Sequence, residues 1–151
     1  MSKPVATNKK AYRDFAFLET MECGIVLKGS EVKSIRAGDV NFKDSFARLE
    51  DAELYLYNLY IAPYAQASYL NPDSDRIRKL LLHKKEIKKL TGKLTQGQVT
   101  LVPSKIYFNK RGIVKVEVAL ATGKKQYDKR EAIQKRDVDR QIARVIKQRQ
   151  R

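Results

Sequence analysis

The sequence predicts a mainly β protein, a small closed antiparallel barrel with short helical insertions and a basic C-terminal tail. Two observations predict this fold class. Before residue 123, apolar residues alternate with polar ones in several short runs, as they do in strands with one buried face. From Lys124 onward the chain is basic and polar and contains neither Gly nor Pro. We therefore expect one barrel domain at 1–123 and a tail at 124–151, because 151 residues are too few for two full domains.

Two elements are predicted in the first forty residues. Residues 13–27 alternate as one strand. Its inner face would hold Phe15, Phe17, Met21, Cys23, Ile25 and Leu27. A short helix follows, because Ser30 can cap it and Val32 and Ile35 lie three residues apart. Gly38 is expected to end this helix.

A hairpin is predicted at residues 45–63, with its turn at 50–53 between two alternating runs. Four tyrosines accompany the second run: Tyr55, Tyr57, Tyr60 and Tyr64. Such rings can stack on unpaired bases. Strand tyrosines more often pack half-buried with a solvated hydroxyl, which is the interpretation we favour.

A second helix is predicted at residues 76–93. The apolar residues that recur there at helical spacing are Ile77, Leu80, Leu81, Ile87 and Leu90. The segment holds eight Lys or Arg residues and a single acidic residue, Glu86. Like charges four residues apart, such as Lys84 and Lys88, cost helix stability. We therefore expect phosphate groups to compensate for the repulsion.

A final hairpin is predicted from the runs at 99–109 and 112–123, with a turn at 109–112. Pro103 indicates an edge or a bulge in its first strand. Five or six strands with two helical insertions favour a closed barrel of the oligonucleotide-binding (OB) type over a helical bundle. A split sheet with helices on one face is the alternative.

The charge of the chain points to a polyanionic partner. The formal net charge is +15, of which the tail contributes +7 from 11 basic and 4 acidic residues. Such a balance favours nucleic acid as the partner. The tail also carries a thin apolar stripe at helical spacing, made by Val138, Ile142, Val145 and Ile146. We expect the tail to be disordered when free and helical against RNA.

Several functions are excluded by composition. Cys23 and His83 are the only residues of their kinds, so a four-ligand zinc site of Cys and His cannot form. A Cys–His nucleophile pair would have to be formed by these two residues, and we do not expect it. No phosphate-binding glycine loop, secretory signal or bilayer-length apolar run is present. We expect a cytoplasmic protein that has no catalytic activity, no cofactor or metal, and no membrane partner.

Six short motifs occur in order along the chain: Asn8-Lys9-Lys10, Glu22-x-Gly24, Gly29-x-Glu31-Val32-Lys33-Ser34-x-Arg36-Ala37-Gly38, Asp44-Ser45, Arg78-Lys79-Leu80-Leu81-Leu82, and Gly123-Lys124-Lys125-x-Tyr127-Asp128-Lys129-Arg130. Together they resemble the SmpB family of bacterial SsrA-binding proteins over nearly the whole chain. The resemblance implies an OB barrel that grips the tRNA-like domain of transfer-messenger RNA in trans-translation. It also implies delivery of the alanylated RNA with elongation factor Tu and GTP to stalled ribosomes. The tail would occupy the decoding centre, formed by small-subunit rRNA, and the empty mRNA channel.

The resemblance assigns RNA binding to Asn8, Glu22 and Leu81, and the neighbouring cations Lys9, Lys10, Arg36, Arg78 and Lys79 fit phosphate contacts. Two of these residues have alternative roles. Glu22 can instead pair with a neighbouring lysine or arginine within a strand. Leu81 can act through packing rather than contact.

The resemblance assigns ribosome engagement to Lys124, Lys125, Tyr127, Asp128, Lys129 and Arg130, with Val145 and Ile146 supporting a tail helix. The chain departs from the family at two positions. Tyr127 replaces a common histidine, which keeps an aromatic ring and loses a titratable one. Thr122 replaces a common lysine. We expect a monomer, and keep two alternatives: a general RNA-binding or ribosomal barrel, and an RNA-modifying enzyme.

Overall fold

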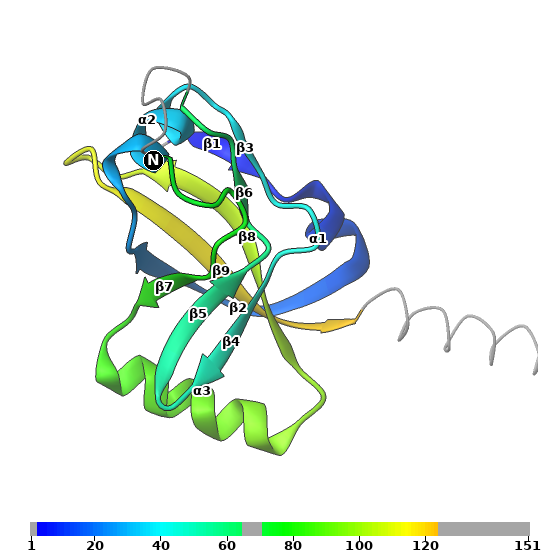
Figure 1. The fold of residues 1–151 in the computed structure, drawn as a ribbon. Helices are drawn as coiled ribbons and strands as arrows, with labels where there is room; N and C mark the ends of the chain where they lie inside the picture. Colours follow the sequence, from blue (N-terminus) through cyan, green and yellow to red (C-terminus); the bar gives the residue numbers. More distant parts are fainter. Residues whose placement is uncertain (1–2, 65–70, 124–151) are drawn as a thin grey trace, which may run out of the picture.

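The computed structural model describes residues 3–64 and 71–123. Within them the strands are β1 (Pro4–Thr7), β2 (Phe15–Ile25), β3 (Val40–Asn41), β4 (Phe46–Glu50), β5 (Glu53–Tyr57), β6 (Tyr60–Ile61), β7 (Arg78–Leu81), β8 (Thr100–Phe108) and β9 (Val114–Gly123). The helices are α1 (Lys9–Asp14), α2 (Gly29–Arg36) and α3 (Lys84–Gln96). Figure 1 shows the strands wrapped around one core, with α3 along one side.

The strands close into an antiparallel barrel. Their order is β1-β8-β4-β5-β7-β2-β9, and an additional pairing of β9 with β8 closes the ring, outside which β1 lies along β8. The short strands β3 and β6 form a separate pair. The predicted closed barrel with short helices is confirmed, and the split sheet is excluded because β9 is hydrogen-bonded to β8 as well as to β2.

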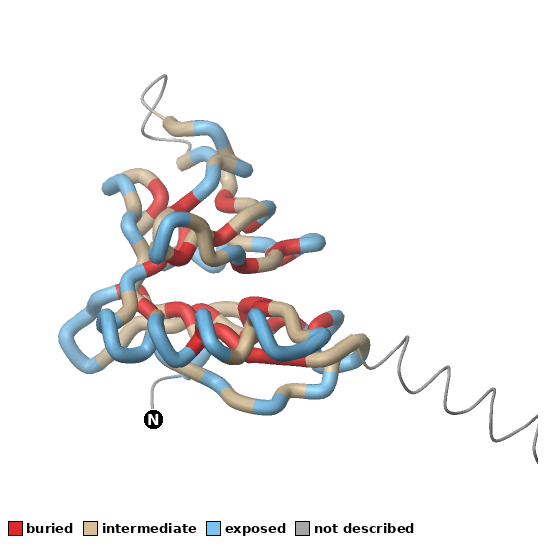
Figure 2. Tube along the Cα trace, turned by 90° about the horizontal axis from the view of Figure 1, so that it is seen from below, coloured by how far each residue is buried: buried red, intermediate tan, exposed pale blue. Residues whose placement is uncertain are grey.

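Alternating side chains fill the interior of the barrel. On β9, Val116 and Val118 are fully buried while Lys115 and Glu117 lie outside. Leu54 and Leu56 of β5 are likewise fully buried. Most buried positions lie on strands, whereas α3 is exposed over most of its length. Figure 2 shows the buried positions gathered in the interior of the body. Burial of one face of each strand supplies the main apolar stabilisation.

Both predicted hairpins are present, but the second strand of the first one ends at Tyr57, and Tyr60–Ile61 form β6, which pairs with β3 instead. The turn between β4 and β5 places Asp51 and Ala52 at φ values of 50° and 61°, the left-handed conformation that a two-residue hairpin turn requires. Gly112, with φ of 75°, serves the turn between β8 and β9. The register between β8 and β9 shifts between Pro103 and Lys105, so the predicted bulge is present.

The helix predicted at residues 76–93 is wrong in its first part. Residues 78–81 form strand β7, and helix α3 begins only at Lys84. The segment alternates between buried Arg78 and Leu80 and the outward Lys79 and Leu81. A charged residue at an inward position conceals this two-residue period, because sequence patterns treat arginine as a surface residue.

Three smaller expectations also need correction. The strand predicted from residue 13 begins at Phe15, because the short helix α1 occupies 9–14. Helix α2 begins at Gly29 with Lys28 as its N-cap residue, so Ser30 lies inside the first turn. The Glu31 carboxylate accepts a hydrogen bond from the Lys28 amide at 2.9 Å. The two-residue strands β3 and β6 are too short to give a periodic signal.

Candidate nucleic-acid interface

Strands β2 and β7 present an outward surface that combines apolar and charged side chains. We call it the β2–β7 surface, and its residues are Glu22, Gly24, Val26, Ile77, Lys79 and Leu81. Leu81 is 50% exposed, and Val26 and Ile77 are exposed to a similar degree. Gly24 lies opposite Leu81 in the antiparallel pair. About half of the Leu81 side chain is therefore open to a partner, while the rest packs over Gly24.

A glycine at position 24 keeps Leu81 in place. A Cβ atom at this position would lie 3.2 Å from the Leu81 Cβ, closer than side chains ordinarily pack. Leu81 would have to shift by a few tenths of an ångström. Gly24 therefore leaves room for Leu81, although the two residues lie far apart in sequence.

Glu22 is held by a tyrosine rather than by a lysine or arginine. The Tyr107 hydroxyl donates a short hydrogen bond to Oε2 of Glu22. Burial raises the pKa of Tyr107, and the bond to Glu22 raises it further, so the phenol stays protonated as the donor. The ion pair considered for Glu22 is therefore replaced by this bond. Sequence patterns gave no signal for it, because the two residues meet only across β9.

A second acidic side chain lies beside Glu22. Glu117 is directly opposite Glu22 in the pairing of β2 with β9. Its carboxylate accepts one hydrogen bond, from the Ser104 hydroxyl at 3.0 Å, and pairs with Lys105 at 3.2 Å. Because like charges directly opposite are unfavourable, these partners and Tyr107 are what allow the two carboxylates to remain together.

Lys79 extends the β2–β7 surface toward β5. Its Nζ lies 2.9 Å from Oε1 of Glu53, whose other oxygen accepts from the Tyr55 hydroxyl at 2.6 Å. The hydrogen bond from Tyr55, together with the hydrogen bond and the charge of Lys79, holds the pKa of Glu53 below its usual value. Tyr55 and Tyr57 are half-buried and hydrogen-bonded to glutamates, as the packing interpretation expects.

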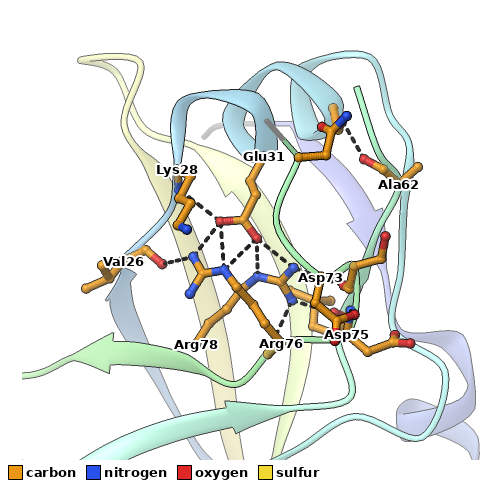
Figure 3. A network of polar contacts seen from close by, with 12 residues as sticks. Val26, Lys28, Glu31, Ala62, Asp73, Asp75, Arg76 and Arg78 are labelled. Atoms are coloured by element: carbon orange, nitrogen blue, oxygen red, sulfur yellow. Dashed lines mark hydrogen bonds and ion pairs between the residues drawn. The ribbon is translucent and has the colours of Figure 1, made fainter. Parts of the chain in front are cut away.

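Arg78, expected to neutralise phosphate, is instead a core residue. It is 0% exposed, and its Nε donates to Oε2 of Glu31 at 2.7 Å. Its remaining nitrogens donate to main-chain carbonyls, including that of Ser74 at 3.0 Å. Figure 3 shows Arg76 on the same carboxylate, with Nε 3.1 Å from Oε2. The hydrogen-bond donors of Arg78 are all used inside the protein, so no part of the Arg78 guanidinium is available to RNA.

Glu31 is the centre of this buried network. It is 2% exposed. Burial acts to raise its pKa, but the hydrogen bonds from Arg76 and the Lys28 amide, together with Arg78, outweigh burial and hold the pKa below its usual value. The network ties helix α2 to strand β7 and to the chain that precedes it. This role was not predicted from the sequence.

Asn8 is also committed to the fold. It is 6% exposed, and its Oδ1 accepts from the Ala11 amide at 3.2 Å as the cap of α1. Its Nδ2 donates to the Pro103 carbonyl at 2.8 Å, at the bulge of β8. The expected contact of Asn8 with base edges does not fit this burial. Asn8 instead fixes the position of Lys9 and Lys10, which follow it on α1.

The cations around α1 and α2 are exposed. Lys9 has no ion pair within the described residues, and Lys10 pairs with the exposed carboxylate of Asp44. The Arg36 guanidinium lies 5.5 Å from the centroid of the Phe108 ring. In Figure 1, α1 and β7 lie on opposite sides of the body. The predicted RNA-binding residues therefore form separate surfaces rather than one cluster.

The remaining predicted site residues, all in the tail from Lys124 to Ile146, lie outside the described residues. In the part that the structure describes, no group of three or more His, Cys, Asp or Glu residues could hold a metal ion. None of the three helices described is long and apolar enough to cross a membrane.

Comparisons with known proteins agree on one family. The family model described as SmpB protein matches residues 5–148. The chain is 58% identical to the SsrA-binding protein of Thermus thermophilus, covering 92% of this chain and 96% of that protein, and 54% identical to that of Thermosipho melanesiensis, covering 96% and 99%. It is also similar to a chain of the solved structure described as "tmRNA-SmpB: a journey to the center of the bacterial ribosome". That match has 61% identity and a TM-score of 0.68, and covers 81% of this chain and 85% of the other. The chain belongs to the SmpB protein family.

Proposed function

We propose that this chain is a non-enzymatic RNA-binding adaptor of ribosome rescue. It binds the tRNA-like domain of transfer-messenger RNA, the SsrA RNA, and delivers that RNA to stalled ribosomes for trans-translation. The observation that carries the proposal is the 61% identity to the chain of the tmRNA-SmpB structure. Similarity to proteins named SsrA-binding protein over more than nine-tenths of the chain supports it.

The β2–β7 surface is the proposed contact for the body of the RNA. Leu81 offers exposed apolar atoms to a base or ribose, and Lys79 can reach a phosphate. Glu22 is suited to accept from a base amine or a ribose hydroxyl, because Tyr107 occupies only one of its oxygens. A carboxylate in this position favours a polar edge over a phosphate, which adds selectivity.

Lys9, Lys10 and Arg36 are proposed to contact phosphates. They are exposed, and electrostatic contacts of this kind contribute affinity that depends on salt but little on sequence. Asn8 acts on RNA binding by fixing α1, and Arg78 by fixing β7 beneath Lys79 and Leu81. Loss of either would impair binding through the fold.

The tail is proposed to act on the ribosome. Its net charge of +7 suits the decoding centre and the empty mRNA channel, both lined by small-subunit rRNA. It would fold there through Lys124, Lys125, Tyr127, Asp128, Lys129, Arg130, Val145 and Ile146. The RNA would arrive alanylated, with elongation factor Tu and GTP, on a monomer of this chain in the cytoplasm.

Truncation after Thr122 tests the separation of the two parts. The truncated chain should keep RNA affinity within about twofold of the full chain, since the proposed RNA contacts lie in the barrel. It should fail to support peptide tagging of stalled ribosomes in a reconstituted translation system. Tagging by the truncated chain, or loss of RNA affinity together with tagging, would contradict this division of roles.

A further inference from the structure

A pocket of about 590 Å³ lies where α1, the turn at 43–46, β8 and the end of β9 meet. Its volume is within the range of sites that hold small ligands, roughly 300–1,000 Å³. Apolar walls come from Ala11, Phe15, Phe46 and Val102. None of the proposed contacts on the β2–β7 surface lines it.

The pocket contains an unsatisfied polar group. Ser45 is 6% exposed, and its Oγ has no hydrogen-bond partner among the described residues. A buried hydroxyl without a partner costs stability, and in a native protein it calls for an explanation. The Oγ atom is itself inaccessible to solvent, so the Ser45 side chain has to rotate toward the pocket before a ligand there can supply the missing partner.

The rim of the pocket carries both hydrogen-bond donors and acceptors. Asp44 and Lys10, which both line the pocket, form an ion pair, and their side chains are 79% and 55% exposed. Exposed pairs of this kind are weak, so a ligand can replace either partner at little cost. Asp14, a second carboxylate that lines the pocket, is 14% exposed and lies 3.1 Å from the Arg13 Nε.

A smaller pocket of about 280 Å³ adjoins the first and shares Asn8, Lys10 and Lys43 with it. It adds the exposed Lys9, so three lysines surround the junction of the two pockets. Lysine ammonium groups are common partners of phosphate. The pair of pockets thus offers an apolar, aromatic compartment beside a cationic one.

From this arrangement we infer that the two pockets bind one unpaired nucleotide of the RNA partner, with the base in the larger pocket and its phosphate at the lysines. Aromatic walls suit the face of a base, while Ser45 and Asp44 suit the donors and acceptors on its edge. A simple anion would not require the apolar walls, and an alkyl chain would not require the polar groups. The inference rests on the proposed function, because it takes RNA to be the partner.

The experiment is an NMR titration of the full-length protein with the 5′-monophosphates of adenosine, guanosine, cytidine and uridine, and with inorganic phosphate as the control ligand. At least one nucleotide should shift the signals of Ala11, Ser45 and Val102 saturably at millimolar concentration. Inorganic phosphate should leave these three signals in place. No response to any nucleotide, or the same response to phosphate alone, would overturn the inference.

Two variants sharpen the titration. Thr100→Phe fills the pocket from β8, and should weaken nucleotide binding about tenfold or more; Thr20→Phe, on an exposed strand position away from the pocket, is its matched control. Ser45→Ala removes only the unpaired hydroxyl, so it should fold like the wild type and weaken binding about threefold. If Thr100→Phe folds and binds nucleotides as the wild type does, the inference is wrong. If Thr100→Phe does not fold, unchanged nucleotide binding by Ser45→Ala refutes the inference instead.

The same proteins separate this inference from the proposed function. If the wild type binds transfer-messenger RNA selectively but no nucleotide reaches the pocket, the pocket inference alone fails. If it binds nucleotides in the pocket but does not prefer transfer-messenger RNA, the pocket stands and the proposed function fails.

Discussion

Buried polar side chains fix the strand from which the exposed side chains of the β2–β7 surface project. Glu31 and Arg78 form an ion pair that is almost completely buried, and both use their remaining hydrogen-bonding groups within the protein. Breaking such a pair from one side leaves an uncompensated charge and commonly costs about 3–5 kcal/mol. The pair therefore stabilises the region from which Lys79 and Leu81 are presented.

Glu31→Gln should lower the free energy of unfolding at pH 7 by about 3 kcal/mol. The glutamate pKa is lowered by folding from its usual value near 4.5, so its contribution is complete above that pH and is lost as the pH falls through the folded pKa. The difference between wild type and variant should thus shrink in acid. Denaturant unfolding between pH 3 and pH 7 measures both effects.

Glu53→Gln is the matched control, because its pair with Lys79 is about half-exposed. It should destabilise the protein at pH 7 much less than Glu31→Gln does, because exposed ion pairs contribute little to stability. Equal losses in the two variants would contradict a special role for the buried network.

Tyr107→Phe tests whether the orientation of Glu22 matters. The substitution removes one hydrogen bond to a carboxylate and leaves the ring in place. If Glu22 contacts RNA, affinity for transfer-messenger RNA should fall about fivefold, corresponding to about 1 kcal/mol. Tyr55→Phe, which removes the bond to Glu53, is the comparison. A filter-binding titration that finds no difference between wild type and Tyr107→Phe would remove Glu22 from the interface.

The boundary between β7 and α3 shows how two elements can share one sequence pattern. Residues 76–93 contain apolar residues at helical spacing, yet Leu80 and Leu81 belong to a strand. The barrel needs β7 to join β5 to β2, and those tertiary hydrogen bonds override the local helical signal. Helix α3 keeps the lysine-rich half, with Leu90 buried against the barrel.

Helix α3 carries three lysines, Lys84, Lys85 and Lys88, that are exposed and form no ion pair within the described residues. If they neutralise phosphates, changing all three to Gln should reduce the slope of log affinity against log salt concentration by about three. The preference for one RNA over another should stay the same.

Lys93→Gln is the control for the α3 variants, because Lys93 is paired with Glu19. It should change the slope by less than about one. An unchanged slope in the triple variant would mean that the basic face of α3 is only solvated.

For the molecule as a whole, the sequence was sufficient to predict the barrel but insufficient to predict its polar interior. Hairpins depend on neighbouring residues and on turns such as that at Asp51 and Ala52, so alternation reveals them. The bonds of Asn8 to Pro103 and of Glu22 to Tyr107 join residues 95 and 85 positions apart. No local pattern predicts such contacts. Arg78 and Asn8 were therefore expected at an RNA surface, although the structure buries both.

The central claim is selective binding of transfer-messenger RNA. We would titrate the full-length protein at near-physiological salt with transfer-messenger RNA and with a matched set of ordinary tRNAs. Tighter binding of transfer-messenger RNA, by about 100-fold or roughly 2.7 kcal/mol, is the predicted result. Equal affinity for all the RNAs would contradict the adaptor function and leave a general basic RNA-binding barrel.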